Sequence, residues 1–411
     1  MLDQPQTGSE SDLSCPSPHL YTKSIKAHSI QPKGPIRTAN EKIYTWTCDR
    51  LSDSVSSQVQ RLAQLDDAFR VAIMPDVQPG DRAPNGCVLA TTHRIYPEAI
   101  GRDIGCGFSA IRFDIQQDTV SKSILVSILS HLESSVPSLM QPSPLAVEAF
   151  PQSCSAEQLS NSALAKQANR EGFLQLGTLG RGNHFIELEV DQAGYLWGLV
   201  HSGSRSMGQA ITDWHLRYTQ SAEMNYLELA TDNGQAYFSD MQWAMRYASE
   251  NRLRMLNRLT DAVEDLLNGS PIESSYIDSP HNFARIENHL GHELIVHRKS
   301  ANSASNGEAA IIPGSMVSGS RIVVGKGNPE SLCSSSHGAG RTMRRSEAFR
   351  KLQVKDFKAI MGSIVYPKEH ARRLLDESPT VYRSLSQVMQ AQCDLVSTRD
   401  TLRTILCYKT S

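Results

Sequence analysis

The alternation of apolar and polar residues predicts short strands along much of the chain. RVAIMPDV and GCVLATT read as buried strands separated by a loop dense in Pro, Gly, Asp and Asn, and FSAIRFDI follows the glycine-rich turn GRDIGCG. HFIELEV and YLWGLVH are separated by DQAG, which is a strong hairpin signal. Further short strands are expected at ELIVHR, AAIIP and SRIVV.

Helical spacing alternates with these strands. DSVSSQVQRLAQL predicts one helix, and the longest is expected over 239–268, with Ser239 as its cap, an apolar stripe that includes Trp243 and Leu259, and Gly269 at its end. Residues 117–172 predict irregular helices, because proline-rich stretches interrupt them. The chain therefore belongs to the mixed α+β class, without regular βαβ alternation.

Composition excludes several classes of protein. The chain has 411 residues, of which 39% are apolar and 20% charged, as in ordinary globular proteins. No apolar run is long enough to span a membrane, and the N-terminal residues resemble no signal peptide, so we expect a cytoplasmic protein. Residues 1–35 are rich in Ser, Pro, Gln and Gly and are expected to form a disordered or loosely attached arm. Eight cysteines without CxxC pairs favour reduced thiols.

The net charge of −2 gives no argument for nucleic-acid binding by the whole molecule. The charge is unevenly distributed, however, because residues 340–411 contain 14 Lys and Arg against 7 Asp and Glu. Such a basic stretch is either a solvated helix face or a surface that follows phosphates, and the charge pattern alone leaves both possibilities open.

Five short stretches place residues that can bind metal or phosphate beside glycine or small polar residues at probable strand ends. They are DIGCG, GNHFIE, VHSGSR, PHN and SHGAGR, with the metal-capable residues Asp103, Cys106, His184, His201, His281 and His337. The period-2 pattern directs His184 and His201 toward an apolar interior, where a divalent metal is a good partner for a buried imidazole. A thiolate can bridge two ions, so the set suggests a two-metal site with mixed ligands.

Other familiar sites do not fit. HELIVH spaces its histidines five apart and reads as a strand, which excludes the zinc-peptidase helix. GSRIVVGKG is one residue too long for a P-loop, and the sequence has no K-x-D-G motif, so lysine is a poor candidate for covalent nucleotide transfer. His337 lies among small residues that let backbone amides approach an anion, where a histidine can attack or protonate a ligand; a flexible turn that contains a histidine is the alternative.

These motifs give the chain a specific resemblance to the RtcB family, the GTP-dependent RNA ligases that join 3′-phosphate or 2′,3′-cyclic-phosphate ends to 5′-hydroxyl ends. The resemblance is carried by PDV, DIGCG, GxGNHFIE, HSGSR, HNF, the stretch IIPGSM…GNPESLCSSSHGAGR and CYK, from about residue 43 to the last residues. It implies one large domain over 36–411, built of antiparallel sheets flanked by helices.

The resemblance also implies roles for individual residues. Two divalent ions, usually manganese in this family, would be bridged by Cys106; His201 and His281 would complete one coordination sphere, and Asp103 and His184 the other. His337 would accept guanylate from GTP. The implied nucleotide contacts are Asn183, Glu187, Asn282, Pro313, Gly314, Ser315, Met316, Ser320, Gly338, Ala339, Gly340, Tyr382 and Lys409. The RNA-binding candidates are Arg341, Arg344 and Arg345.

The chain departs from the family pattern at one informative position. Gln78 stands where PDVHxG would give a histidine, and glutamine cannot titrate near neutral pH. Two alternatives to an RNA ligase therefore stay open: a metal-dependent phosphoesterase that acts on RNA ends, and an RNA-binding paralogue that does not ligate. The need for an activating partner is not implied by the sequence.

Overall fold

The structure is a computed structural model that describes residues 36–37, 40–47, 49–143, 149–221 and 223–410. The predicted arm, residues 1–35, lies outside these residues. Within them, no helix has the length and apolar character needed to cross a bilayer, and the six cysteines present are free thiols.

Two sheets dominate the fold, and the predicted α+β class of antiparallel sheets flanked by helices is confirmed. The first has the order β1-β2-β3-β4-β12-β11 and the second the order β10-β6-β8-β7-β18; of these neighbours only β2 and β3 pair in parallel. The strands of the first are Ile36–Arg37, Ile43–Thr45, Ala68–Gln78, Asn85–Thr91, His292–Lys299 and Asn282–His289. Those of the second are Pro271–Pro280, Gly107–Gln116, Tyr195–Ser202, Phe185–Val190 and Arg403–Tyr408.

Three smaller sheets complete the β structure. A three-stranded sheet has the order β14-β15-β17, and two pairs join β13 to β16 and β5 to β9. Their bounds are Ala309–Pro313, Ser320–Gly325 and Val396–Thr401; Ala301–Ser303 and Ser334–Ser336; Arg94–Ile95 and Leu227–Glu228. The predicted hairpin of β7 and β8 and the strands at ELIVHR, AAIIP and SRIVV are confirmed, whereas β18 has no counterpart among the predicted strands.

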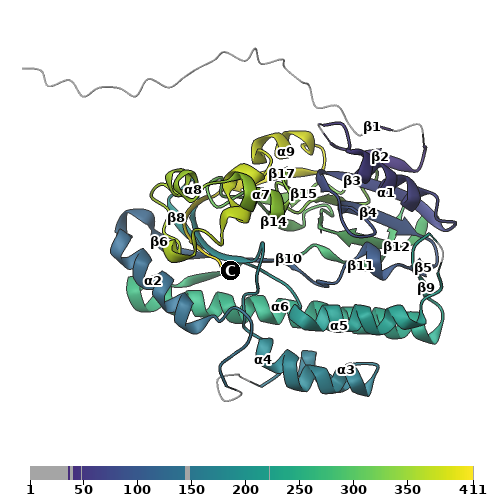
Figure 1. Cartoon of the computed structure of the whole chain (residues 1–411), viewed down its shortest axis with the longest axis horizontal. Helices are drawn as coiled ribbons and strands as arrows, with labels where there is room; N and C mark the ends of the chain where they lie inside the picture. Colours follow the sequence, from purple (N-terminus) through teal and green to yellow (C-terminus); the bar gives the residue numbers. More distant parts are fainter. Residues whose placement is uncertain (1–35, 38–39, 48, 144–148, 222, 411) are drawn as a thin grey trace, which may run out of the picture.

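Helices cover the sheets on two sides. Figure 1 shows α6 along one side of the sheets and α7, α8 and α9 on the other. Their bounds are Asp232–Leu267, Arg345–Lys351, Val354–Met361 and Leu385–Ala391. The other helices are α1 (Asp53–Ala63), α2 (Lys122–Ser135), α3 (Ser162–Gln167), α4 (Phe173–Gln175) and α5 (Arg205–His215). The prediction of irregular helices over 117–172 was right only in part: α2 is a regular helix of 14 residues, whereas between 149 and 175 the described chain folds into short helical turns.

The prediction for the longest helix was wrong at its start. Helix α6 begins seven residues before Ser239, with Thr231 as the cap, whose hydroxyl accepts a hydrogen bond from the amide of Gly234 at 3.2 Å. The sequence DNGQ resembles a loop, but Gly234 is present because a Cβ there would lie 2.1 Å from the carbonyl oxygen of Glu228. The helix ends at Asn268, which adopts the left-handed conformation (φ 54°) predicted for Gly269.

Candidate active site

The ends of four strands meet at one edge of the five-stranded sheet. Gly107, the first residue of β6, pairs with Ser202 at the end of β8 and with Pro280 at the end of β10. Phe185, the first residue of β7, pairs with His201. Cys106, His184 and His281 each lie one residue beyond a strand, so the antiparallel register gathers them beside His201.

Cys106, His184 and His201 form a compact cluster of ligand atoms. Their sulfur and Nε2 atoms all lie within 4.8 Å of one another, and all three residues are buried. The sulfur of Cys106 is 3.5 Å from Nε2 of His184 and 3.4 Å from Nε2 of His201. Asp103 extends the cluster, with its Oδ2 atom 3.2 Å from Nε2 of His184.

The second nitrogen of each clustered imidazole is held by a backbone carbonyl. Nδ1 of His184 donates to the carbonyl of Leu179 at 3.0 Å, and Nδ1 of His201 donates to that of Asn183 at 3.1 Å. This arrangement fixes the tautomer and directs both Nε2 lone pairs at Cys106. It is the orientation that metal-binding histidines need.

His281 and Asp103 both carry unsatisfied polar atoms. Nδ1 of His281 and Oδ1 of Asp103 are buried without a hydrogen-bond partner in the described part of the chain. The ring of His281 lies 5.3 Å from that of His201 and 4.8 Å from that of His337, measured between centroids. Orphaned acceptors beside a thiol and two imidazoles fit a divalent cation.

Burial controls the protonation of this cluster. It lowers the pKa of His201 and His281 well below the usual range, with smaller contributions from His184 and His337 respectively. Burial and then the Asp103 carboxylate raise the pKa of the Cys106 thiol well above its usual value. For Asp103 burial alone would raise the pKa, but the hydrogen bond with His184 and other contacts outweigh it, and the net shift is downward. A bound cation would therefore displace the proton of Cys106.

His337 lies beside this cluster, just after β16. Its Nδ1 atom is 2.6 Å from Oδ2 of Asp76, a fully buried carboxylate on β3 that also accepts the backbone amides of His337 (3.2 Å) and Gly338 (3.3 Å). Sequence reasoning quoted Asp76 only as part of PDV and gave it no role. The carboxylate leaves Nε2 of His337 as the nitrogen available for chemistry.

The loop after His337 passes very close to β3. A Cβ at Gly340 would lie 2.4 Å from the carbonyl oxygen of Asp76, and its φ of 73° favours glycine. Arg383 joins the same loop to β3, because its guanidinium donates to the carbonyls of Val77 (3.0 Å) and Arg341 (3.3 Å). SHGAGR is thus a tightly placed loop.

A cavity of about 340 Å³, the His337 cavity, opens onto His337 and most of the cluster. Many of the predicted site residues line it, and several lie outside its wall. Those that line it are Asp103, Cys106, Asn183, His201, His281, Asn282, Pro313, Gly314, His337, Gly338, Ala339, Gly340, Arg341, Arg345 and Tyr382. Those that do not are His184, Glu187, Ser315, Met316, Ser320, Arg344 and Lys409.

Behind this wall, buried Glu377 binds several of the predicted residues. Its carboxylate accepts from Arg341 (3.1 Å), Tyr382 (2.5 Å) and Lys409 (3.2 Å), and it also pairs with Arg345. Burial raises the pKa of Glu377, but Lys409 and the arginines outweigh burial, and the net pKa is lowered. The sequence offered no signal for Glu377, because two acidic residues before Ser and Pro in DESP are typical of a surface turn.

Two further carboxylates, those of Glu187 and Glu189, are also buried. Glu187 and Glu189 are both on β7, and Glu189 accepts from Thr404 at 3.0 Å and Ser320 at 3.2 Å. Burial, and then the neighbouring Glu187, raise the pKa of Glu189 well above its usual value. Ser320 and Glu187, both predicted nucleotide contacts, therefore belong to a buried acidic layer.

Helix α6 contacts the sheet edge at which Cys106, His184, His201 and His281 lie, which we call the metal-capable edge. Arg252, 1% exposed, donates to the carbonyls of Gly105 (2.7 Å) and Ser202 (3.0 Å) and pairs with Asp278 at 2.8 Å. One guanidinium thus joins the DIGCG turn to the end of β8. Arg252 belonged only to a predicted helix, and its role follows from the tertiary structure.

Comparison with known proteins identifies the family of this chain. The sequence profile of the RtcB family, described as tRNA-splicing ligase RtcB, matches residues 58–157 and 143–410. The RNA-splicing ligase RtcB of Escherichia coli (strain K12) is 32% identical over 405 residues, which cover 91% of this chain and 98% of that protein. The tRNA-splicing ligase RtcB of Thermococcus kodakarensis is 26% identical, covering 82% of this chain and 87% of its own length. This chain belongs to the RtcB family.

Proposed function

We propose that this protein is an RNA ligase that uses GTP and two divalent metal ions, manganese, to join RNA 3′-phosphate or 2′,3′-cyclic-phosphate ends to 5′-hydroxyl ends. The related proteins of Escherichia coli and Thermococcus kodakarensis are named as splicing ligases for RNA and tRNA. The observation that carries the proposal is the position of His337: Asp76 binds its Nδ1 atom, and its ring lies 4.8 Å from His281 at the metal-capable edge.

His337 is the proposed nucleophile. With the proton on Nδ1 and Asp76 as its acceptor, the lone pair of Nε2 is free to attack the α-phosphorus of GTP. A P–N bond forms, the bond to the pyrophosphate oxygen breaks, and pyrophosphate leaves. The carboxylate of Asp76 stabilises the positive charge that the ring acquires.

Asp103, Cys106, His184, His201 and His281 would hold the two metal ions. When bound, such ions act as Lewis acids that neutralise charge on attacking and leaving phosphate oxygens. Gly338, Ala339 and Gly340 line the same cavity, and these small residues let a phosphate group come close to the backbone. The amides of Gly338 and Ala339 already donate to Asp76 and to the carbonyl of Pro313, so they hold the loop in place.

The later steps transfer guanylate to RNA. An oxygen of the RNA 3′-phosphate attacks the phosphorus on His337, the P–N bond breaks, and the RNA end becomes an activated diphosphate. The 5′-hydroxyl of the second strand then attacks the 3′-phosphorus and GMP leaves. A cyclic end is first opened by water.

Covalent labelling tests this proposal. Incubation with GTP labelled at the α-phosphate and manganese should attach one guanylate to the protein, and His337→Ala should abolish the label. His93→Ala is the matched control, because His93 is exposed and remote from the cavity. Labelling that persists in His337→Ala would place the nucleophile elsewhere.

The position of Gln78 suggests an experiment that separates the ligase from the phosphoesterase alternative. Gln78 lines the His337 cavity and cannot act as a proton donor near neutral pH. Joining of a defined RNA pair, with and without GTP, is compared for the unaltered protein and Gln78→His. GTP-dependent joined product supports the ligase. Release of phosphate or opening of cyclic ends without joining, in both proteins, would support the phosphoesterase.

A further inference from the structure

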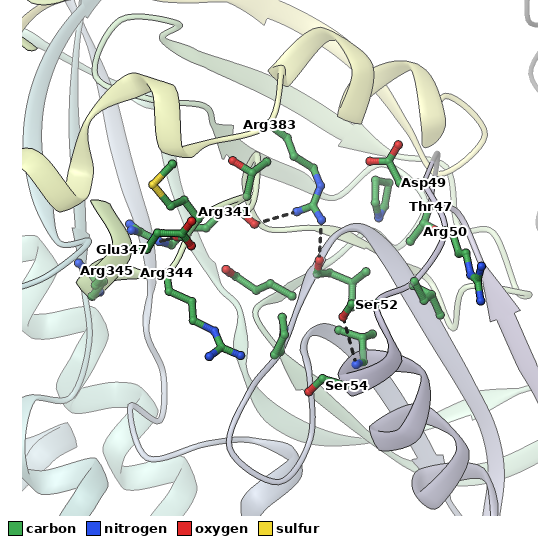
Figure 2. Close-up of a pocket in the computed structure, with 18 residues that line it drawn as sticks. Thr47, Asp49, Arg50, Ser52, Ser54, Arg341, Arg344, Arg345, Glu347 and Arg383 are labelled. Atoms are coloured by element: carbon green, nitrogen blue, oxygen red, sulfur yellow. Dashed lines mark hydrogen bonds between the residues drawn. The ribbon is translucent and has the colours of Figure 1, made fainter. Parts of the chain in front are cut away.

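A larger groove adjoins the His337 cavity. It has a volume of about 690 Å³, and five arginines line it: Arg50, Arg341, Arg344, Arg345 and Arg383. Figure 2 shows Arg341, Arg344 and Arg345 on one side, Asp49, Arg50 and Ser52 on the other, and Arg383 between them. We call it the arginine groove. Gln78, Arg341 and Arg345 line both spaces, so the groove leads to His337.

The five arginines differ in how their charge is compensated. Arg341 and Arg345 pair with Glu377, and Arg345 also pairs with Asp376. Arg50 lies at the far rim and pairs with no carboxylate among the described residues. Two of the three predicted RNA-binding arginines therefore have acidic partners already.

Arg344 and Arg383 are different. In the described part of the chain neither has a carboxylate partner: Arg344 is exposed, and Arg383 donates only to the two backbone carbonyls described above. The one carboxylate near them in the groove wall, Glu347, is paired with Lys351 at 2.5 Å. Together with Arg50 at the far rim, the groove thus carries three positive charges without a carboxylate partner in the described part of the chain, and these favour a polyanion.

A buried hydrogen-bond donor lies at the junction between the arginine groove and the His337 cavity. Nη2 of Arg341 is buried and has no hydrogen-bond partner among the described residues. A phosphate oxygen at this junction would satisfy that donor. The remaining wall includes Leu51, Val55 and Pro79, apolar surfaces that suit sugars and bases.

We propose that the arginine groove holds the backbone of a single-stranded RNA, with Arg344 and Arg383 as its main phosphate contacts, and that the reacting end of this strand passes Gln78 into the His337 cavity. This inference rests on the proposed function for the identity of the polyanion. It assigns the phosphate contacts to the uncompensated arginines of the groove and not to the basic stretch as a whole.

Binding of short RNA tests the assignment. Fluorescence anisotropy is measured at several salt concentrations for two oligonucleotides, one ending in a 3′-phosphate with the dye at its other end, and one with a free 5′-hydroxyl and the dye at its 3′ end. Arg344→Ala should weaken binding of one of them roughly tenfold. It should also reduce the slope of log K against log salt by about 0.7, the value for one phosphate contact of a single strand. The oligonucleotide that is affected is the strand that lies in the groove.

The matched control is Arg350→Ala, which removes the same charge from the exposed face of α7 outside the groove. It should leave both affinities within about twofold of the unaltered protein. Arg383→Ala should act as Arg344→Ala does; Arg383→Lys, which keeps the charge, should recover part of the affinity and shows whether loss reflects charge or a displaced loop.

Equal losses in Arg350→Ala and Arg344→Ala, or no loss for either oligonucleotide in Arg344→Ala and Arg383→Ala, would overturn the inference. Guanylate labelling of the unaltered protein is scored in parallel. If labelling occurs and the groove variants bind RNA normally, only the groove assignment fails. If labelling does not occur but the groove variants lose RNA, only the ligase proposal fails.

Discussion

Asp76 and His337 are joined by a hydrogen bond of 2.6 Å between Oδ2 and Nδ1, although 260 residues separate them in the chain. The same carboxylate also binds the amides of His337 and Gly338. Asp76 therefore fixes both the tautomer of the imidazole and the start of the loop that follows it.

Asp76→Asn should reduce the rate of guanylate labelling by about 10²- to 10⁴-fold, because an amide can present its NH₂ group to Nδ1 and favour the wrong tautomer. Single-turnover incorporation of labelled GMP measures the rate. Asp394→Asn is the matched control: Asp394 accepts from the indole of Trp46 at 3.0 Å, away from the cavity. An unchanged rate in Asp76→Asn would show that Asp76 only shapes the backbone.

Cys106→Ser should lower the affinity for divalent ions by at least about tenfold, because a hydroxyl replaces the ligand at the centre of the cluster. Metal content after dialysis, measured by mass spectrometry, gives the result. Cys154→Ser, a buried thiol in a different core cluster, should keep the metal content of the unaltered protein. Equal metal content in both variants would mean that Cys106 is not a ligand.

Arg252→Met should destabilise the protein by about 3–5 kcal/mol, because it leaves Asp278 without its cation and two carbonyls without a donor. Arg252→Lys should restore part of this stability without holding both carbonyls. Urea unfolding measures the effect. Arg258→Ala, on an exposed turn of the same helix, should change stability by less than about 0.5 kcal/mol. A similar small change in Arg252→Met would contradict the role given to α6.

The stability of the protein should fall as pH rises from about 6.5 toward 9. Hydrogen bonds with Cys333 and then Glu287 raise the pKa of His289 from 6.5 to about 9. Its protonated form therefore stabilises the fold fully below pH 6.5, and this contribution is lost as the pH rises through 9.

Glu287 affects the stability at acidic pH. Burial opposes its ionisation, but Arg298 outweighs burial and lowers its pKa to about 2, so its contribution is lost only as pH falls from 4.5 through 2.

His289→Gln tests the alkaline part. Urea midpoints across this pH range should decline less steeply in His289→Gln than in the unaltered protein. His292→Gln, at the exposed start of β12, should keep the original decline. Parallel curves for the unaltered protein and His289→Gln would exclude His289 as the titrating group.

The sequence predicted the strands of the site well, because FIELEV and YLWGLV are short apolar-rich runs separated by a turn signal. It did not predict their burial: both faces of β7 are buried, including Glu187 and Glu189. The gathering of His184, His201 and Cys106 at one edge could be anticipated in kind, since each lies at a strand end. Asp76, Arg252 and Glu377 could not be assigned in this way. Most of their partners are distant in the chain, from Asp278, 26 positions from Arg252, to His337, 261 positions from Asp76, and local patterns do not encode such hydrogen bonds.

The predicted start of α6 was wrong for a related reason. The first turn of the helix contains Gly234, which propensity disfavours, and only the contact with Glu228 explains why glycine is needed there. Strand β18 was missed because its partner β7 lies more than 200 residues earlier.

The alignment of strand ends at the metal-capable edge has a consequence for assembly. Its donors come from four strands of one sheet, spread from Asp103 to His281, so no hairpin or single fragment can gather them. Binding of a metal ion would therefore require that all four strand ends are already folded together. A bound ion would in turn stabilise these four strand ends as a unit and oppose local unfolding of any one of them.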